Sequence, residues 1–234
     1  MKKIVTLIAI LFLTVSFITT KHFAPKGIIR HDVPIDKYKK LGNQPEFDCV
    51  GRYSISEESS DYAVGVLIAP KWVLTAAHFV NKPSVWKFGS RYYKTKRIIK
   101  HPDLKPNAEE TQWTGHDMAL VELENPVTDI SPAKRYYGNE ELGNTITKIG
   151  YGYIGNGKTG LADPRVQERL GGQNVVDAIG GTFENRNFSQ NVMVCDFDDP
   201  ESTELNHFGS PTPLELAIGG SNVDSGGGVF VKKK

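Results

Sequence analysis

Three short segments of the sequence each hold a residue type that nucleophilic hydrolysis needs. In the first, an apolar run that ends in two alanines leads to His78, and such small neighbours let other side chains approach its ring. In the second, Asp117 opens a strongly apolar stretch. A carboxylate drawn toward the interior must be hydrogen-bonded or paired, and an imidazole N–H is a suitable partner. In the third, Ser225 lies in a glycine-rich turn that leaves its hydroxyl little crowded.

Together these residues match the chemistry of an activated serine. A serine hydroxyl is a weak nucleophile that needs a neighbouring base, and the base needs an orienting group. The sequence therefore offers Ser225 as nucleophile, His78 as base and acid, and Asp117 as the group that fixes the imidazole tautomer. Val223 stands where the Gly-x-Ser-x-Gly elbow of α/β-hydrolases has its first glycine, so the segment around Ser225 is not that elbow.

The elements that must position these residues are predicted to be strands. Short runs rich in Val, Ile, Tyr and Thr are bounded by Gly, Pro, Asn or Asp, which is typical of strands between turns. They cover residues 64–69, 72–76, 85–88, 92–100, 118–123, 145–149 and 192–197. The best helix candidate, residues 164–170, is too short to organise a fold. We therefore predict an all-β sandwich or barrel.

Composition excludes several classes of function. The 234 residues carry 28 Lys+Arg against 27 Asp+Glu, a net charge of +1, which does not suggest the basic footprint of a nucleic-acid-binding protein. Two cysteines exclude a dense disulfide scaffold and a four-thiolate zinc site. No two histidines have the spacing of a metal-binding pair on one helix, so we expect no metal and no cofactor, with a metal site as the alternative.

The N-terminus has the layout of a secretory signal. Lys2 and Lys3 precede an apolar run over residues 4–18, which is shorter than the about 20 residues of a membrane span. We assign residues 1–24 to a signal peptide and expect a secreted or periplasmic protein with no other membrane contact. An uncleaved anchor is the alternative.

With these residues in place, the sequence resembles the chymotrypsin/trypsin-like serine proteases. The resemblance rests on Leu74-Thr75-Ala76-Ala77-His78, Asp117-Met118-Ala119-Leu120 and Asp224-Ser225-Gly226-Gly227, in the chain order His, Asp, Ser that the family has. Residues 65–70, 101–102 and 150–152 add supporting matches. The resemblance covers residues 50 to the end, and residues 25–49 then form a pro-segment or an N-terminal segment that leads into the domain.

The resemblance implies two antiparallel six-stranded β-barrels with the site between them. It implies a secreted, bacterial-type serine endopeptidase that acts on proteins or peptides through an acyl-enzyme. The backbone N–H groups of Val223 and Ser225 would form the oxyanion hole. Asp224 would pair with an N-terminal amine that cleavage frees at Ile28 or Ile29.

The sequence departs from the family pattern in several places. Val223 replaces the family's glycine, and a β-branched residue disfavours backbone conformations that glycine reaches cheaply. The chain ends soon after Ser225, so we expect an incomplete second barrel and little activity in this chain. Phe79 replaces a cysteine beside His78, and Gly219, near the position of the pocket base, does not select a basic side chain.

Several alternatives stay open at this stage. The chain is a peptidase, an inactive trypsin-like homologue that binds proteins or peptides, or a secreted β-domain with a structural role. Cys49 and Cys195 either pair or remain free thiols. Adjacent strand residues point to opposite faces, so we expect His116 to lie outside the catalytic set. The remaining histidines expected at the surface are His31, His101 and His207.

Overall fold

Strands dominate the protein, in agreement with the all-β prediction. The computed structural model describes residues 29–59, 63–82, 84–104, 114–161, 168–183, 186–206, 208–210, 212–220 and 224–231, and the predicted signal segment lies outside them. The first half contains α1 (Ile35–Gly42), η1 (Pro45–Phe47), β1 (Val50–Ser54), β2 (Ala63–Ala69), β3 (Trp72–Thr75), β4 (Val85–Phe88), β5 (Arg91–Lys100) and β6 (Ala119–Leu123). The second half contains β7 (Thr145–Gly150), β8 (Gly155–Asn156), β9 (Gly160–Leu161), β10 (Leu170–Val175), β11 (Ala178–Phe183), β12 (Arg186–Val194), η2 (Thr203–Leu205) and β13 (Gly228–Val231).

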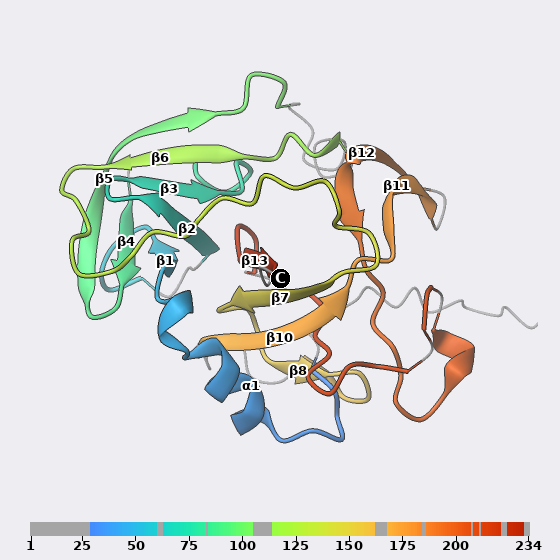
Figure 1. The fold of residues 1–234 in the computed structure, drawn as a ribbon. Helices are drawn as coiled ribbons and strands as arrows, with labels where there is room; N and C mark the ends of the chain where they lie inside the picture. The colour runs from blue at the N-terminus through green and yellow to red at the C-terminus, as the bar shows by residue number, and fades with distance from the viewer. Residues whose placement is uncertain are drawn as a thin grey trace, which may run out of the picture.

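The first six strands close into a barrel, which confirms the first of the two barrels expected. Their order is β1-β2-β3-β6-β5-β4, and every neighbouring pair is antiparallel. The barrel occupies the left of Figure 1, away from β11 and β12. Alternate side chains of its strands point inward, as the two-residue period of a strand requires. The largest fully buried ones in the barrel are Trp86, Phe88, Leu67, Leu123, Val50, Val64, Val73 and Val121.

Two glycines make room for the largest of these rings. Gly51 of β1 lies directly opposite Gly65 of β2. A Cβ on Gly65 would lie 2.4 Å from the Trp86 ring, and one on Gly51 would lie 2.5 Å from the Phe88 ring. The two aromatic rings therefore fill space that any side chain at positions 51 and 65 would occupy. The barrel interior is closely packed for this reason.

The second half forms smaller sheets. β7 lies between β10 and β13, β11 pairs with β12, and β8 pairs with β9. The turn before β13 also touches the barrel, since the backbone N–H of Val64 in β2 donates to the carbonyl of Ser225 at 3.0 Å. Figure 1 shows β13 between β7 and the barrel. A second, incomplete barrel stays a prediction, because none of these described sheets closes.

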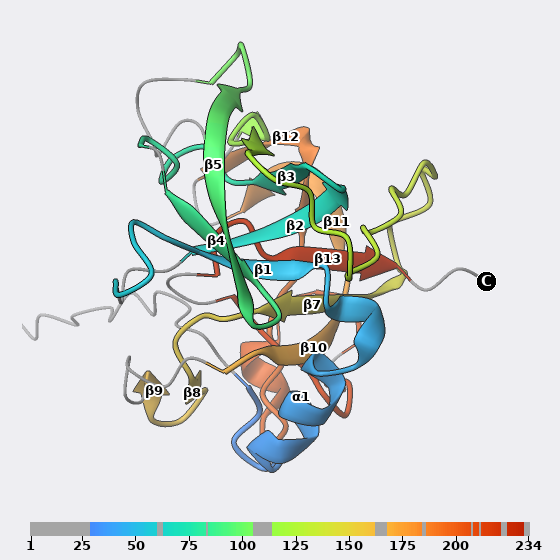
Figure 2. The same ribbon diagram turned by 90° about the vertical axis from the view of Figure 1, so that its left-hand side faces the viewer.

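Helix α1, which the sequence analysis missed, covers the outer side of β10. Figure 2 shows it beneath β7 and β10. The helix and strand backbones meet closely, because a Cβ on Gly42 would lie 2.7 Å from the Gly171 nitrogen. The Tyr38 ring is fully buried beneath the helix, where its hydroxyl donates to the carbonyl of Ala217 at 3.1 Å and accepts from the N–H of Arg30 at 3.2 Å. Residues 29–49 thus pack onto the second half before the chain enters the barrel.

Other expectations need correction. Leu170, placed in a helix candidate, opens strand β10, and residues 164–167 of that candidate lie outside the described residues. The strand predicted over 192–197 begins earlier and ends sooner, as β12. His31 and His101 are half-buried rather than surface residues, and His207 lies outside the described residues.

Both cysteines are free thiols, which decides between the two alternatives for Cys49 and Cys195. Burial raises the pKa of the Cys49 thiol to about 11 and also raises that of Cys195. Both are therefore weakly nucleophilic at neutral pH, because the thiolate is the reactive form.

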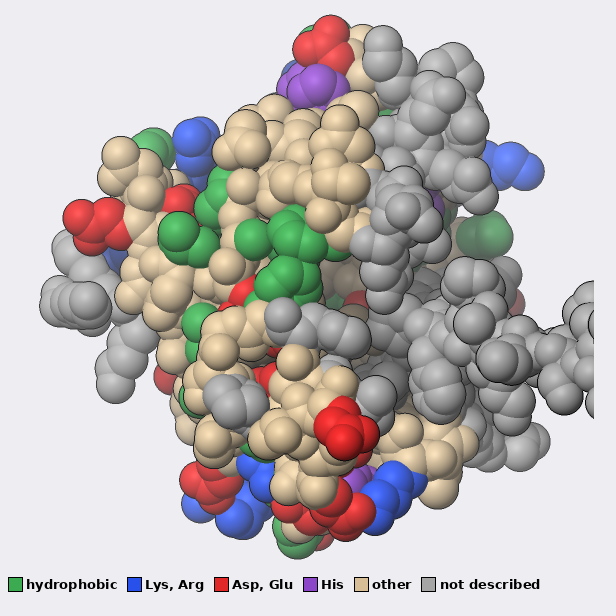
Figure 3. All heavy atoms as spheres, turned by 90° about the vertical axis from the view of Figure 1, so that its right-hand side faces the viewer, with side chains coloured by type: hydrophobic (Ala, Val, Ile, Leu, Met, Phe, Trp, Pro, Cys, Tyr) green, Lys and Arg blue, Asp and Glu red, His purple; other side chains and the backbone are tan. Residues whose placement is uncertain are grey.

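The described surface carries charges of both signs. On the face shown in Figure 3, acidic and basic side chains lie side by side at the lower end. Within the described part of the chain, no helix has the length and hydropathy that a bilayer span requires.

The hydroxyl of Tyr38 gives a first test of the fold. Tyr38→Phe keeps the ring but leaves the Arg30 N–H and the Ala217 carbonyl without their partner, so we expect a loss of about 1–3 kcal/mol in free energy of unfolding. Urea unfolding measures it. Tyr137→Phe is the matched control, since Tyr137 is 81% exposed. Equal losses in the two variants would contradict the packing of residues 29–49 onto the second half.

Three carboxylates near the end of β12 give a second test. Burial, together with repulsion from Asp196 and Asp177, raises the pKa of Asp198 to about 6, and its Oδ1 is buried without a hydrogen-bond partner in the described structure. The folded state therefore holds a proton that the unfolded state releases near pH 4. This contribution to stability is complete below that pH and is lost as the pH rises through about 6.

Asp198→Asn should remove this loss. Between pH 4 and pH 7 we expect the free energy of unfolding of the native chain to fall by about 1 kcal/mol more than that of the variant, after allowance for solvent screening. Urea titrations at the two pH values measure the difference. Glu58→Gln, at an exposed carboxylate, should follow the native chain. If the free energy of unfolding changes with pH in the same way in the native chain and in Asp198→Asn, the raised pKa of Asp198 is refuted.

Candidate active site

The end of β3 and the start of β6 hold the two residues predicted to act as base and orienter. β3 ends at Thr75, and its register partner in β6 is Ala119. His78 follows β3 and Asp117 precedes β6, so the pairing of the two strands brings both residues to the same end of the barrel. The carbonyl of Asp117 also accepts from the backbone N–H of Ala77 at 3.4 Å.

Asp117 and His78 are in direct contact. His78 Nδ1 lies 2.6 Å from Asp117 Oδ2. The other carboxylate oxygen, Oδ1, accepts from the backbone N–H groups of Ala77 and His78, each at 2.9 Å. Burial alone would raise the pKa of Asp117, but the hydrogen bonds from His78 and the two amides hold it below its ordinary value. Asp117 is therefore an ionised carboxylate with partners for both oxygens.

The His78 ring is partly open to solvent. Its side chain is 29% exposed, against 15% for Asp117. The ring of Phe79 packs edge-on against it, with centroids 5.1 Å apart, and Phe79 in turn contacts Tyr53 of the barrel. The aromatic residue that replaces the family's cysteine thus supports the histidine by packing. The sequence analysis noted Phe79 only as a departure.

Ser225 reaches the same region through its backbone. Asp224 to Gly227 form a tight turn, in which the N–H of Gly227 donates to the carbonyl of Asp224 at 2.8 Å. A Cβ on Gly226 would lie 2.1 Å from the Val64 carbonyl oxygen and 3.1 Å from the Ala76 nitrogen. The turn is therefore pressed against β2 and the segment that leads to His78. Among the described residues, no hydrogen bond joins the Ser225 hydroxyl to the His78 ring.

The remaining predicted site residues lie partly within and partly outside the described part of the chain. Val223, expected to supply an oxyanion-hole amide, lies outside the described residues, as does Ile28. Asp224 Oδ1 accepts from the N–H of Gly152 at 2.7 Å. Asp224 and Ile29 both line a cavity of about 170 Å³ between β7, β10 and β13.

His116 lies outside the His78–Asp117 pair, as predicted from its neighbour's orientation. Its ring stacks on that of His101, with centroids 4.8 Å apart and planes 1° from parallel. Asp117 faces His78, whereas His116 faces His101.

This arrangement agrees with the comparisons with known proteins. Residues 41–195, two thirds of the chain, match the sequence model of the family described as Trypsin. The chain belongs to the Trypsin family. The matched residues include His78 and Asp117 and end before Ser225.

Two curated relatives match shorter stretches. The thrombin-like enzyme flavoxobin of Protobothrops flavoviridis is 31% identical over 99 residues, 38% of each chain. A trypsin of Simulium vittatum is 34% identical over 73 residues, 27% of this chain and 28% of its own. The alignments thus span well under half of these relatives. A solved structure titled HL collagenase has 22% identity and a TM-score of 0.42, and the match covers 58% of this chain and 60% of that one.

The turn that carries Ser225 gives a test of the site. Gly226 has φ +82°, a conformation that costs other residues about 1–2 kcal/mol, and a Cβ there also meets the Val64 backbone. We expect Gly226→Ala to lower the free energy of unfolding by about 3 kcal/mol or more.

Gly143→Ala is the matched control for this variant. Gly143 has φ +73°, and a Cβ there meets nothing within 4 Å, so only the conformational cost of about 1–2 kcal/mol applies. Urea unfolding compares the two. If Gly226→Ala lowers the free energy of unfolding no more than the control does, the turn does not press on β2.

Proposed function

We propose that this protein is a secreted serine endopeptidase with Ser225 as nucleophile, His78 as general base and acid, and Asp117 as orienter. The observation that carries the proposal is the 2.6 Å contact between His78 Nδ1 and a carboxylate whose other oxygen is held by two backbone amides. A histidine fixed through Nδ1 presents Nε2 to a nucleophile. The carboxylate stabilises the imidazolium that forms when Nε2 takes up the proton.

The approach of the Ser225 turn to the His78 segment supports the role of the serine. Gly226 packs against Val64 and Ala76, so the neighbouring Ser225 lies near the segment that carries His78. In free enzymes catalytic hydrogen bonds are often long and tighten only with substrate bound. The proposed reaction then runs through attack of Ser225 Oγ on a peptide carbonyl, proton transfer to His78, and loss of the amine to leave an acyl-enzyme that water hydrolyses.

Two further groups complete the proposed machinery. The N–H groups of Ser225 and Val223 would stabilise the oxyanion, a role that is worth roughly 10²–10³ in rate per donor. An amine freed by cleavage at Ile28 or Ile29 would pair with Asp224. The shared cavity supports this pairing, because Ile29 and Asp224 both line it.

Covalent labelling with a fluorophosphonate tests the proposal. We expect the probe to label the folded full chain at Ser225, located by peptide mass spectrometry, because the phosphonate needs a serine that a base activates. Ser225→Ala should abolish labelling. Ser56→Ala, at an exposed serine of the β1–β2 connection, should label like the native chain.

Asp117→Asn separates activation from mere accessibility. It keeps the shape of the side chain but favours the wrong tautomer of His78, so labelling should slow by about 10³–10⁴-fold. Labelling at another serine would refute the assignment of the nucleophile. A protein that circular dichroism shows to be folded and that does not label at all would instead be an inactive relative.

A further inference from the structure

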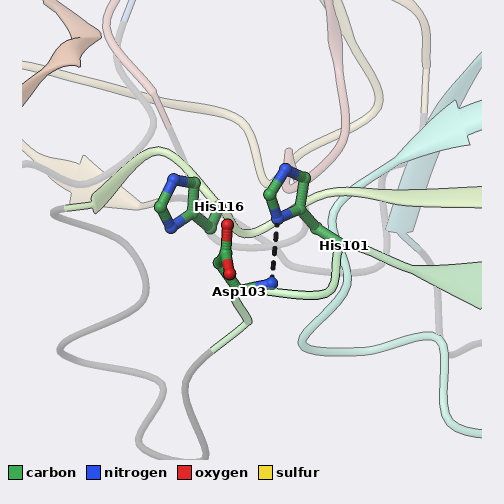
Figure 4. A group of neighbouring side chains, drawn as sticks. All are labelled: His101, Asp103 and His116. Carbon is green, nitrogen blue, oxygen red and sulfur yellow. Dashed lines mark hydrogen bonds between the residues drawn. The ribbon is translucent and has the colours of Figure 1, made fainter.

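A second group of chemically active side chains lies beyond the His78–Asp117 pair. His101 follows β5, Asp103 lies two residues further on, and His116 precedes β6. One potential ligand atom from each of the three lies within 4.8 Å of the other two. Figure 4 shows the Asp103 carboxylate beside the two imidazole rings. The peptidase mechanism proposed above uses none of the three.

The backbone around this group is fixed by the barrel. The N–H of His101 donates to the carbonyl of Met118 at 2.9 Å, next to the β5–β6 pairing. The N–H of Leu104 donates to the carbonyl of His101 at 3.1 Å and closes the turn that holds Asp103. The three side chains therefore project from two segments that hydrogen bonds hold side by side.

One nitrogen of the group lacks a partner. His116 Nδ1 is shielded from solvent and accepts or donates no hydrogen bond in the described structure. A buried polar atom of this kind calls for an explanation, of which a bound ion is one. The Asp103 carboxylate beside it supplies the negative charge that a cation needs.

From these observations we infer that His101, Asp103 and His116 form a binding site for a divalent transition-metal ion of the zinc type. Imidazole nitrogens favour zinc, copper and nickel, whereas Ca²⁺ and Mg²⁺ prefer oxygen ligands. Two imidazoles and one carboxylate leave a fourth tetrahedral position to water. The inference does not depend on the proposed peptidase activity.

Binding requires a small local rearrangement. Zinc–ligand bonds of about 2.0–2.2 Å set tetrahedral ligands roughly 3.4 Å apart, so the ligand atoms must draw together. The parallel rings must turn about χ2, which is a soft torsion. His101 Nδ1 also accepts from the Asp103 N–H at 3.2 Å. Binding of the ion removes this single hydrogen bond, because Nδ1 either ligates the ion itself or carries the ring proton when Nε2 ligates.

Histidine spacing along a helix, the pattern used to predict metal sites from the sequence, does not apply to this group. The three residues come from two connections of a barrel, and they meet only because β5 and β6 pair. His101 and Asp103 lie only two residues apart in the sequence, but nothing in the sequence placed His116 beside them.

Isothermal titration calorimetry of the full chain with ZnCl₂ tests the inference. We expect one Zn²⁺ per chain, and Mg²⁺ in excess should not compete. His116→Ala and the shape-conserving Asp103→Asn should each weaken binding by at least about tenfold. His31→Ala, at a half-buried histidine paired with Glu201, should bind like the native chain.

His78→Ala distinguishes this site from the candidate active site. It should keep native zinc affinity, and Co²⁺ should give the visible bands of a four-coordinate ion in that variant but not in His116→Ala. Circular dichroism confirms that each variant is folded. Absence of stoichiometric binding, equal affinity in His116→Ala, Asp103→Asn and the native chain, or loss of binding in His78→Ala alone would overturn the inference.

Discussion

The carboxylate of Asp117 is the constraint on which the candidate site depends. It lies where β3 leaves the barrel and β6 enters it, and it joins the two through the amides of Ala77 and His78 and the His78 ring. A half-buried carboxylate without these donors would be costly, so the segment after β3 must turn back toward it. The orientation of His78 therefore follows from the need to satisfy a single anion.

The barrel makes that arrangement rigid. The Gly51–Gly65 pair admits Trp86 and Phe88 to the interior, and their packing supports the barrel whose strands β3 and β6 flank His78 and Asp117. The same compactness explains why a glycine is needed at position 226. With φ +82° and no side chain, Gly226 lets the turn with Ser225 approach the Val64 carbonyl and the Ala76 nitrogen.

Local patterns predicted the first barrel well and the second half poorly. Runs rich in Val, Ile, Tyr and Thr between clear turn residues mark β2 to β6, so their bounds differ from those expected by one residue at most. β10 and β13 are rich in glycine and carry little periodicity, and α1 had been assigned to a lead-in segment although Asp36 and Lys40 suit the two ends of a helix. The family motifs indicated His78 and Asp117, whereas the group of His101, Asp103 and His116 depends on tertiary pairing that no local pattern encodes.

The order of the elements along the chain also has a consequence in time. Every strand of the closed barrel, and with them His78 and Asp117, is synthesised before β7, and domains begin to form from the N-terminal side during synthesis. The turn with Ser225 follows these elements in the chain, and it packs against Val64 and Ala76, which belong to the earlier part. In a nascent chain the residues that bring His78 and Asp117 together are thus all present well before Ser225 is synthesised.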